Sequence, residues 1–255
     1  MKKHIASILF LFLLSTFQLI AQSHSVKRLG IEQGLSNNYV VSITQDKQGF
    51  LWFATEEGLN KFDGTRFTTY YKNDLTQDNQ GITGNELNRV YADTKHPIIW
   101  IATQRDGLNA YNYNEQTFTA YQHNPENPHS LITNDVTDIA PSTQHDDGLW
   151  ISTYYRGIEY LDITSGQFTH YNKSTVPSLP CDQTWTVLDG GDGNLYIGHV
   201  GSGFSIFSPK DKSVKNFRNE AGNPMSLPGN DVFCIIKDAN GNIWLGTNNG
   251  LALYA

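Results

Sequence analysis

Cysteine and charged residues are scarce in this sequence, and each shortage argues against a class of protein. Two cysteines among 255 residues are too few for a disulfide scaffold. Charged side chains make up 17% of the chain, whereas soluble domains usually contain roughly 25%. The formal net charge of −7 argues against nucleic-acid binding, because nucleic-acid binders present a basic surface. After the N-terminal segment, no stretch repeats apolar residues every ~3.6 positions over the length of a helix.

Glycine and aromatic residues are abundant instead. The chain contains 22 Gly, 13 Tyr, 13 Phe and 5 Trp. Aromatic residues favour strands and glycine favours tight turns, so this composition suits short strands better than long helices. The length corresponds to one large domain or two small ones.

Residues 1–21 have the layout of a secretory signal peptide. Lys2 and Lys3 form a basic start, residues 5–20 are mostly apolar and uncharged, and Ala21 precedes polar residues. We predict cleavage after Ala21 and export of the remaining chain. The alternatives are a buried N-terminal helix or a retained anchor, although the apolar run is shorter than the ~20 residues that span a membrane.

One motif recurs along the rest of the chain. An aromatic residue is followed by an apolar residue, a small residue and usually Thr, and then by a Gly–apolar pair. Such repetition predicts a repeat architecture in which the aromatic residues and glycines are structural. The aromatic residues are Trp52, Trp100, Trp150, Tyr196 and Trp244, and the glycines are Gly58, Gly107, Gly157, Gly203 and Gly250.

Each unit is predicted to form four short strands separated by turns. In the first unit we expect strands at residues 39–45, 50–55, 59–62 and 66–71. Four strands in ~45 residues are typical of a β-propeller blade. We therefore predict an all-β fold, a β-propeller of about five four-stranded blades that packs each repeated aromatic residue between neighbouring blades. The propeller is expected to cover residues 22–255, with blades at about 35–71, 84–121, 131–171, 180–217 and 228–254.

The two ends of the repeat do not match. Residues 26–29 resemble the fourth strand of a unit, whereas the fifth unit stops after its third strand. An N-terminal strand that completes the last blade would seal the ring, because it removes an open edge. The chain could therefore close into five blades, or it could be the first part of a longer propeller. We favour the longer propeller.

Several motifs resemble two-component regulator propeller repeats. They are residues 34–38, 46–52, 58–64 and 124–131. The resemblance implies the N-terminal, periplasmic part of a hybrid two-component sensor, in which such blades usually form seven-bladed propellers. It also implies a downstream membrane anchor and histidine kinase, and in many members detection of oligosaccharides. On this basis we expect an incomplete part of a seven-bladed propeller, without enzyme activity of its own.

The leading hypothesis is a periplasmic propeller that detects an oligosaccharide and regulates a histidine kinase in cis, with a homodimer as a further possible assembly. No cofactor, metal or nucleic acid is expected. One alternative is a stand-alone five-bladed, lectin-like module. The other is a propeller glycosidase or lyase, which would need paired carboxylates. Asp135, Asp182 and Asp231 are the candidates for that role, and we interpret them as turn residues. Asp46 and Asp238 are likewise interpreted as turn formers.

The turns between the second and third strands vary most while the residues around them recur. Variable loops on a constant frame are where binding residues concentrate. Tyrosine could stack on sugar rings, and arginine could form a bidentate pair with a carboxylate or sulfate. The candidate ligand-binding residues are Gln104, Arg105, Tyr154, Tyr155 and Arg156.

The two cysteines and the histidines give no further site. Aligning the fourth and fifth units places Cys181 and Cys234 about 17 Å apart along the strands, whereas a disulfide needs Cα atoms within about 7 Å. We predict two free, largely buried thiols. The histidines show no metal-ligand spacing, and His199 replaces the repeated Thr, which we interpret as a packing change.

Overall fold

The computed structural model describes residues 26–72 and 81–254. These residues form nineteen strands and one three-residue 3₁₀ helix, η1 (Ile31–Gln33), which confirms the all-β prediction. No helix in the described part of the chain is long and apolar enough to cross a membrane. The predicted signal peptide lies outside the described residues.

Five antiparallel sheets follow one another along the chain, and each is a meander in which consecutive strands pair. The first contains β1 (Val40–Gln45), β2 (Leu51–Thr55), β3 (Gly58–Phe62) and β4 (Phe67–Tyr70). The second contains β5 (Leu87–Ala92), β6 (Ile98–Thr103), β7 (Leu108–Asn112) and β8 (Thr117–Tyr121). The third contains β9 (Val136–Pro141), β10 (Gly148–Thr153), β11 (Gly157–Asp162) and β12 (Gln167–Tyr171). The fourth contains β13 (Thr184–Asp189), β14 (Leu195–His199), β15 (Phe204–Phe207) and β16 (Val214–Phe217). The fifth contains β17 (Val232–Lys237), β18 (Ile243–Thr247) and β19 (Gly250–Tyr254).

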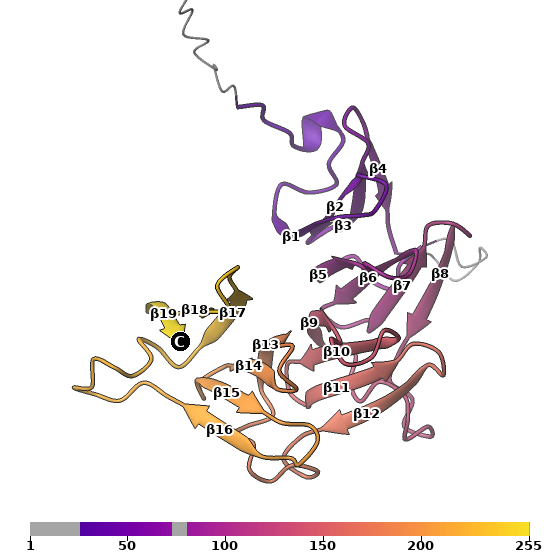
Figure 1. Ribbon diagram of the computed structural model, residues 1–255. Helices are drawn as coiled ribbons and strands as arrows, with labels where there is room; N and C mark the ends of the chain where they lie inside the picture. The colour runs from indigo at the N-terminus through magenta and orange to yellow at the C-terminus, as the bar shows by residue number, and fades with distance from the viewer. Residues whose placement is uncertain (1–25, 73–80, 255) are drawn as a thin grey trace, which may run out of the picture.

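The sheets are arranged as propeller blades around an arc (Figure 1). Strands β1, β5, β9, β13 and β17 lie on its inner side, and consecutive members of this set contact each other. The structure thus confirms the predicted propeller of about five blades, four of them four-stranded. Residues 26–29 belong to none of the five sheets and carry no assigned strand, so their role as a closing strand stays a prediction.

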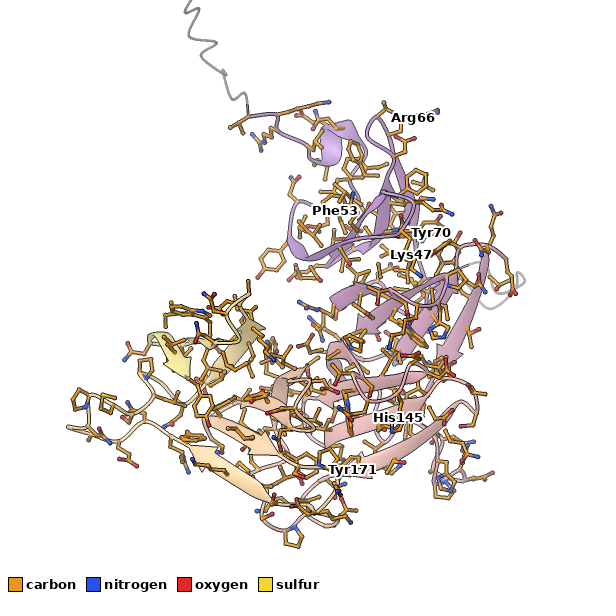
Figure 2. The ribbon with its side chains drawn as sticks, in the orientation of Figure 1. Lys47, Phe53, Arg66, Tyr70, His145 and Tyr171 are labelled. Atoms are coloured by element: carbon orange, nitrogen blue, oxygen red, sulfur yellow. The ribbon has the colours of Figure 1, made fainter. Side chains whose placement is uncertain are left out.

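The hydrophobic core lies between the blades, because each cluster of buried residues joins two consecutive sheets. Trp52 of the first blade, for example, packs 5.6 Å from the ring of Tyr111 in the second (ring centroids). Trp52 and Trp100 are fully buried. Figure 2 shows the labelled Tyr70 and Tyr171 among side chains that fill the space between neighbouring sheets. No blade therefore has a core of its own.

In the first, second and fifth blades, an aspartate at the turn after the first strand holds the repeated tryptophan. Asp46 accepts two backbone N–H groups of its turn with one carboxylate oxygen, at 2.9 and 3.0 Å. Its other oxygen accepts the indole N–H of Trp52 at 2.8 Å. The interpretation of this residue as a turn former was therefore incomplete, because it also anchors the indole. The same indole bond joins Trp100 to Asp93 (3.2 Å) and Trp244 to Asp238 (3.0 Å).

The third blade obtains this anchor from its neighbour. Its turn carries Ser142 in place of Asp46. Trp150 donates its indole N–H to Asp189 of the fourth blade, at 3.2 Å. In that blade Gly190 takes the turn position and the aspartate precedes it by one residue. A shift of one position turns a strand side chain to the opposite face, which here is the face toward the third blade.

The repeated glycine also joins neighbouring blades. Gly58 has a φ of 107° and donates its N–H to the carbonyl of Asn85, which belongs to the next blade (2.9 Å). A Cβ atom at this position would lie 2.8 Å from the carbonyl oxygen of Tyr70. Both the left-handed backbone and the close approach therefore require glycine.

The first and last blades each leave an apolar face uncovered. Ile43 is 59% exposed, whereas the equivalent Val90 of the second blade is 2% exposed. At the other end, Leu251 is 64% exposed and the equivalent Leu59 is fully buried. Both faces carry the kind of residues that join neighbouring blades, so the five described blades do not close into a ring among themselves.

Replacing Asp189 with Ala tests the anchor that is shared between blades. The substitution removes the acceptor for the indole of Trp150 and for the backbone N–H and hydroxyl of Thr143 (3.0 and 2.6 Å). Since it leaves the buried indole N–H of Trp150 without a partner, we expect the free energy of unfolding to fall by about 1–3 kcal/mol in urea denaturation.

Asp146→Ala is the matched control for this substitution. Asp146 is 85% exposed and pairs with Lys95 on the surface, and such pairs contribute at most about 1 kcal/mol. Equal losses for the two variants would contradict a special role for Asp189.

Candidate ligand-binding face

The turns between second and third strands lie on one side of the arc, which we call the turn face (residues 56–57, 104–106, 154–156, 200–202 and 248–249). In four blades the turn donates a backbone N–H to the segment just before the first strand, as from Tyr154 to the carbonyl of Asp135 (3.1 Å). The repeated Thr accepts an N–H of the same turn, as Thr153 does from Arg156 (3.2 Å). The backbone of each turn is thus fixed while its side chains remain free.

The predicted ligand-binding residues separate into two groups on this face. Gln104 and Tyr154 are half-buried, whereas Arg105, Tyr155 and Arg156 are exposed. The rings of Tyr154 and Tyr155 meet edge to face with centroids 4.2 Å apart. Among the described residues, no side-chain hydrogen bond or ring contact joins Gln104 or Arg105 to the two tyrosines. The two groups lie on adjacent blades, the second and the third.

The tyrosine pair continues into the next two blades. Tyr154 lies 6.0 Å from Trp185 of the fourth blade, and Trp185 lies 5.8 Å from Phe233 of the fifth (ring centroids). Both contacts are edge to face, with interplanar angles of 82°. We call Tyr155, Tyr154, Trp185 and Phe233 the aromatic ladder. It crosses three blades, and its end members are 54% and 44% exposed.

A β-bulge places Trp185 and Phe233 in this row. Each first strand shifts register near its start, and one residue is left without a partner. Such a bulge redirects the side chain of the extra residue. The five bulged residues are Val41, Asn88, Thr137, Trp185 and Phe233.

Sequence reasoning missed Trp185 and Phe233 because they lie within strands rather than in the variable turns. One signal was available, since Trp185 is the one tryptophan that does not occupy the repeated aromatic position. The bulge itself leaves no mark in the sequence that would show where its side chain points.

Carboxylates flank the ladder. Desolvation raises the pKa of Tyr155, with smaller contributions from Tyr154 and from the charge of Asp135. Its hydroxyl therefore stays protonated at neutral pH and can donate a hydrogen bond. Asp231 accepts the backbone N–H of Gly201 at 2.6 Å, and Asp182 accepts that of Lys173 at 2.7 Å. These two carboxylates hold turns in place, as the sequence interpretation expects.

The described residues contain no cluster of three or more His, Cys, Asp or Glu that could hold a metal ion. His199 is buried, lies 2.8 Å from the hydroxyl of Ser205 through Nε2, and has its pKa lowered by burial to about 4. Its Nδ1 lies 3.5 Å from the sulfur of Cys181. His199 is therefore a neutral packing residue at physiological pH.

Both cysteines are free, as predicted, but the prediction that they are largely buried was wrong. Cys181 is half-buried and Cys234 is exposed. The positions equivalent to Cys234 in the third and fourth blades, Asp138 and Thr186, are 7% and 5% exposed. Cys234 is exposed because it lies on the fifth blade, where no following blade covers it among the described residues.

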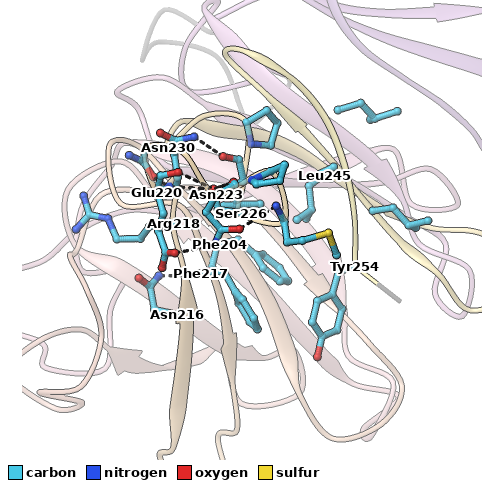
Figure 3. Close-up of a pocket in the computed structure, with 18 residues that line it drawn as sticks. Phe204, Asn216, Phe217, Arg218, Glu220, Asn223, Ser226, Asn230, Leu245 and Tyr254 are labelled. Carbon is cyan, nitrogen blue, oxygen red and sulfur yellow. Dashed lines mark hydrogen bonds between the residues drawn. The ribbon is translucent and has the colours of Figure 1, made fainter.

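A cavity of about 1130 Å³ lies beside β19 (Figure 3). It is bounded by the end of β16, by the segment from Arg218 to Asn230 and by β19 itself. Consecutive β19 residues, whose side chains alternate between the two faces of the sheet, all contribute to its wall. The cavity therefore lies along the strand edge that a fourth strand covers in the other blades, and we do not assign it a ligand.

A buried ion pair lies away from the turn face. Glu159 is fully buried, accepts the N–H of Ile132 at 3.0 Å and lies 3.1 Å from Nδ1 of His170. The other ring nitrogen of His170 lies 2.9 Å from the carbonyl oxygen of Pro128. The hydrogen bond from Glu159 raises the pKa of His170, and burial raises that of Glu159. The pair holds residues 128–132 onto the third blade.

This pair predicts a loss of stability in mild alkali. A folded-state pKa above the unfolded value means that the bound proton stabilises the fold below about pH 6.5, and that this contribution is lost as the pH rises through the folded pKa. We expect the free energy of unfolding to fall as the pH rises above about 6.5, and to fall less in His170→Gln, as measured by urea unfolding at each pH. His129→Gln, at an exposed position, is the control, and an unchanged slope in His170→Gln would contradict the assignment.

Comparison with known proteins places these repeats in a family. The model described as two component regulator propeller matches residues 34–57 and 226–249, in the first and fifth units. Two segments of the chain therefore match two-component regulator propeller repeats. The family resemblance found in the sequence is therefore confirmed.

Three relatives extend this comparison. The extracellular domain of the hybrid two component system BT3049 from B. thetaiotaomicron is 68% identical, with a TM-score of 0.84 over 90% of this chain and 30% of that chain. The extracellular domain of BT4673 from the same organism is 23% identical, with a TM-score of 0.72 over 91% and 32%, and supports the fold alone. Histidine Kinase P4 of Formosa agariphila is 42% identical over 66 residues, which are 26% of this chain and 5% of that protein. The propeller chain spans less than a third of each of these relatives.

Proposed function

We propose that this propeller is the ligand-sensing input of a two-component system. In this proposal the turn face receives an oligosaccharide, and binding regulates a histidine kinase that belongs to the same polypeptide. The observation that carries the proposal is the pair of exposed Tyr155 and half-buried Tyr154 on a fixed backbone frame, in a chain that is 68% identical to the extracellular domain of a hybrid two component system. The matching segment of a histidine kinase supports the assignment of the output.

The propeller acts outside the cytoplasm in this proposal, in the periplasm and anchored through the rest of the polypeptide. The signal-peptide layout of residues 1–21 and the extracellular relatives support that compartment. No catalytic step is assigned to the propeller, because Asp182 and Asp231 are engaged by turn backbone. A ligand would act by binding one arrangement of the sensor more tightly than another and so shifting their populations.

The test uses the complete extracellular region and a panel of neutral and acidic oligosaccharides. We expect at least one member to bind in titration calorimetry, and the same member to induce a reporter controlled by the parent kinase. Binding without induction would leave a carbohydrate-binding module, whereas an absence of both across the panel would contradict the proposal. A phosphorylation-site variant of the kinase is the control for the reporter.

A further inference from the structure

The aromatic ladder departs from the repeat at the positions where the other blades use small or polar residues. Asn88, a bulged residue like Trp185, donates its side-chain amide to the carbonyl of Val136 in the next blade at 2.7 Å. Thr137, the next bulged residue, lies 3.3 Å from the carbonyl of Thr184. Trp185, which is half-buried, and Phe233, which is 44% exposed, carry aromatic rings in place of these bonds between blades. The repeat alone does not explain that exchange.

The indole of Trp185 differs from every other indole in the chain. The other four each donate the ring N–H to an aspartate. The N–H of Trp185 has no acceptor among the described residues, and it is not buried, because no buried side-chain nitrogen lacks a partner there. A free donor on a half-buried aromatic side chain suits a ligand that has both apolar and hydroxyl surfaces.

The open ends of the arc do not account for the exposure of Tyr154, Tyr155 and Trp185, whereas Phe233 lies on the last described blade. Tyr154 and Tyr155 belong to the third blade and Trp185 to the fourth, and both blades are covered by neighbours on each side. Exposed aromatic surface on interior blades is unfavourable for an isolated protein and marks a binding site.

The geometry and charge of the ladder limit the ligand. The ring centroids are 4.2, 6.0 and 5.8 Å apart from one member to the next, so the aromatic surface continues over three blades. Among the described residues no cation lies over a ladder ring, because the cation–π contacts involve only Phe50, Trp52 and Phe217. At the Tyr155 end, the carboxylate of Asp135 acts on the tyrosine hydroxyl through its charge, which disfavours an anionic ligand there.

From these observations we infer that the aromatic ladder is a stacking platform for a linear, neutral oligosaccharide whose chain extends from the third blade to the fifth. Its sugar rings would turn relative to one another along the row, so that their apolar C–H surfaces contact Tyr155, Trp185 and Phe233, because the planes of Trp185 and Phe233 are inclined by 82°. Its hydroxyl groups would accept from the indole of Trp185 and from the tyrosine hydroxyls. The inference rests on the proposed function and narrows it to one surface and one ligand class.

The experiment compares variants of the complete extracellular region with three neutral hexasaccharides: cellohexaose, xylohexaose and mannohexaose. At least one is expected to bind, and to bind more tightly than its disaccharide, because the platform crosses three blades. Trp185→Ala and Phe233→Ala should each weaken binding at least about tenfold, as truncation of a central aromatic residue does at binding hot spots. The fluorescence change on binding should disappear in Trp185→Phe.

Tyr71→Ala is the matched control, since Tyr71 is an aromatic residue that is 47% exposed and lies outside the ladder. It should bind the hexasaccharide with unchanged affinity. Circular dichroism and urea unfolding of every variant separate a lost site from a lost fold.

Three outcomes would overturn the inference. The first is binding of a neutral hexasaccharide that is unchanged in both Trp185→Ala and Phe233→Ala. This result would place the sensing function that we propose at another surface. The second is binding and induction by hexagalacturonate or a sulfated hexasaccharide alone, which also preserves sensing. The third is a lack of binding by all three neutral hexasaccharides. Only a lack of induction by any oligosaccharide would remove the proposed function itself.

Discussion

Every other feature of this molecule depends on the contact between the aromatic residue of one blade and the apolar face of the next. A four-stranded sheet has two faces and cannot bury both by itself, so the core forms between blades. Trp52 and Trp100 are fully buried because a following blade covers them, whereas Trp244 of the fifth blade is only half-buried. The position is the same in each unit, and the neighbour decides its burial. Stability is therefore a property of pairs of blades.

Because the core lies between the blades, the turn face remains available for binding. The repeated Thr and Gly close each turn through one bond, as when the hydroxyl of Thr153 donates to the carbonyl of Gly157 at 2.8 Å. Since main-chain atoms and the Thr hydroxyl hold the turn, the side chains at its tip contribute little to folding. Tyr155 can therefore occur where another blade has Arg105 without a change in the frame. The side chain at the bulge can also vary without a change in the frame, because the bulged residue takes no part in the backbone pairing between strands.

The sequence predicts the features that recur in every blade. It does not predict the features of one blade that depend on how the adjacent blade differs from the others. The spacing of Trp and Gly placed the strands of the first unit within one residue of their observed bounds. The bond from Trp150 to Asp189 was not predicted. The third blade lacks an aspartate at the turn position, and Asp189 of the fourth blade, one residue before its own turn position, accepts the indole N–H instead. The exposure of Cys234 was predicted wrongly for a similar reason, since it depends on what covers the fifth blade. Phe233 and Trp185 were missed because strand alternation alone does not reveal a bulge.

The position of the ladder connects ligand binding to the packing of the blades. Trp185 lies between Thr184 and Thr186, and both of these residues bond to the third blade. The hydroxyl of Thr184 donates to the carbonyl of Thr153 at 2.8 Å, and that of Thr186 donates to the carboxylate of Asp138 at 2.6 Å. A ligand that orders the ring of Trp185 would therefore act one residue away from the bonds that set the relative position of two blades. The ligand can shift the relative position of the blades only if it binds one arrangement more tightly than the other. An oligosaccharide that contacts three blades has more contacts that can differ between the arrangements than a single sugar held by one turn.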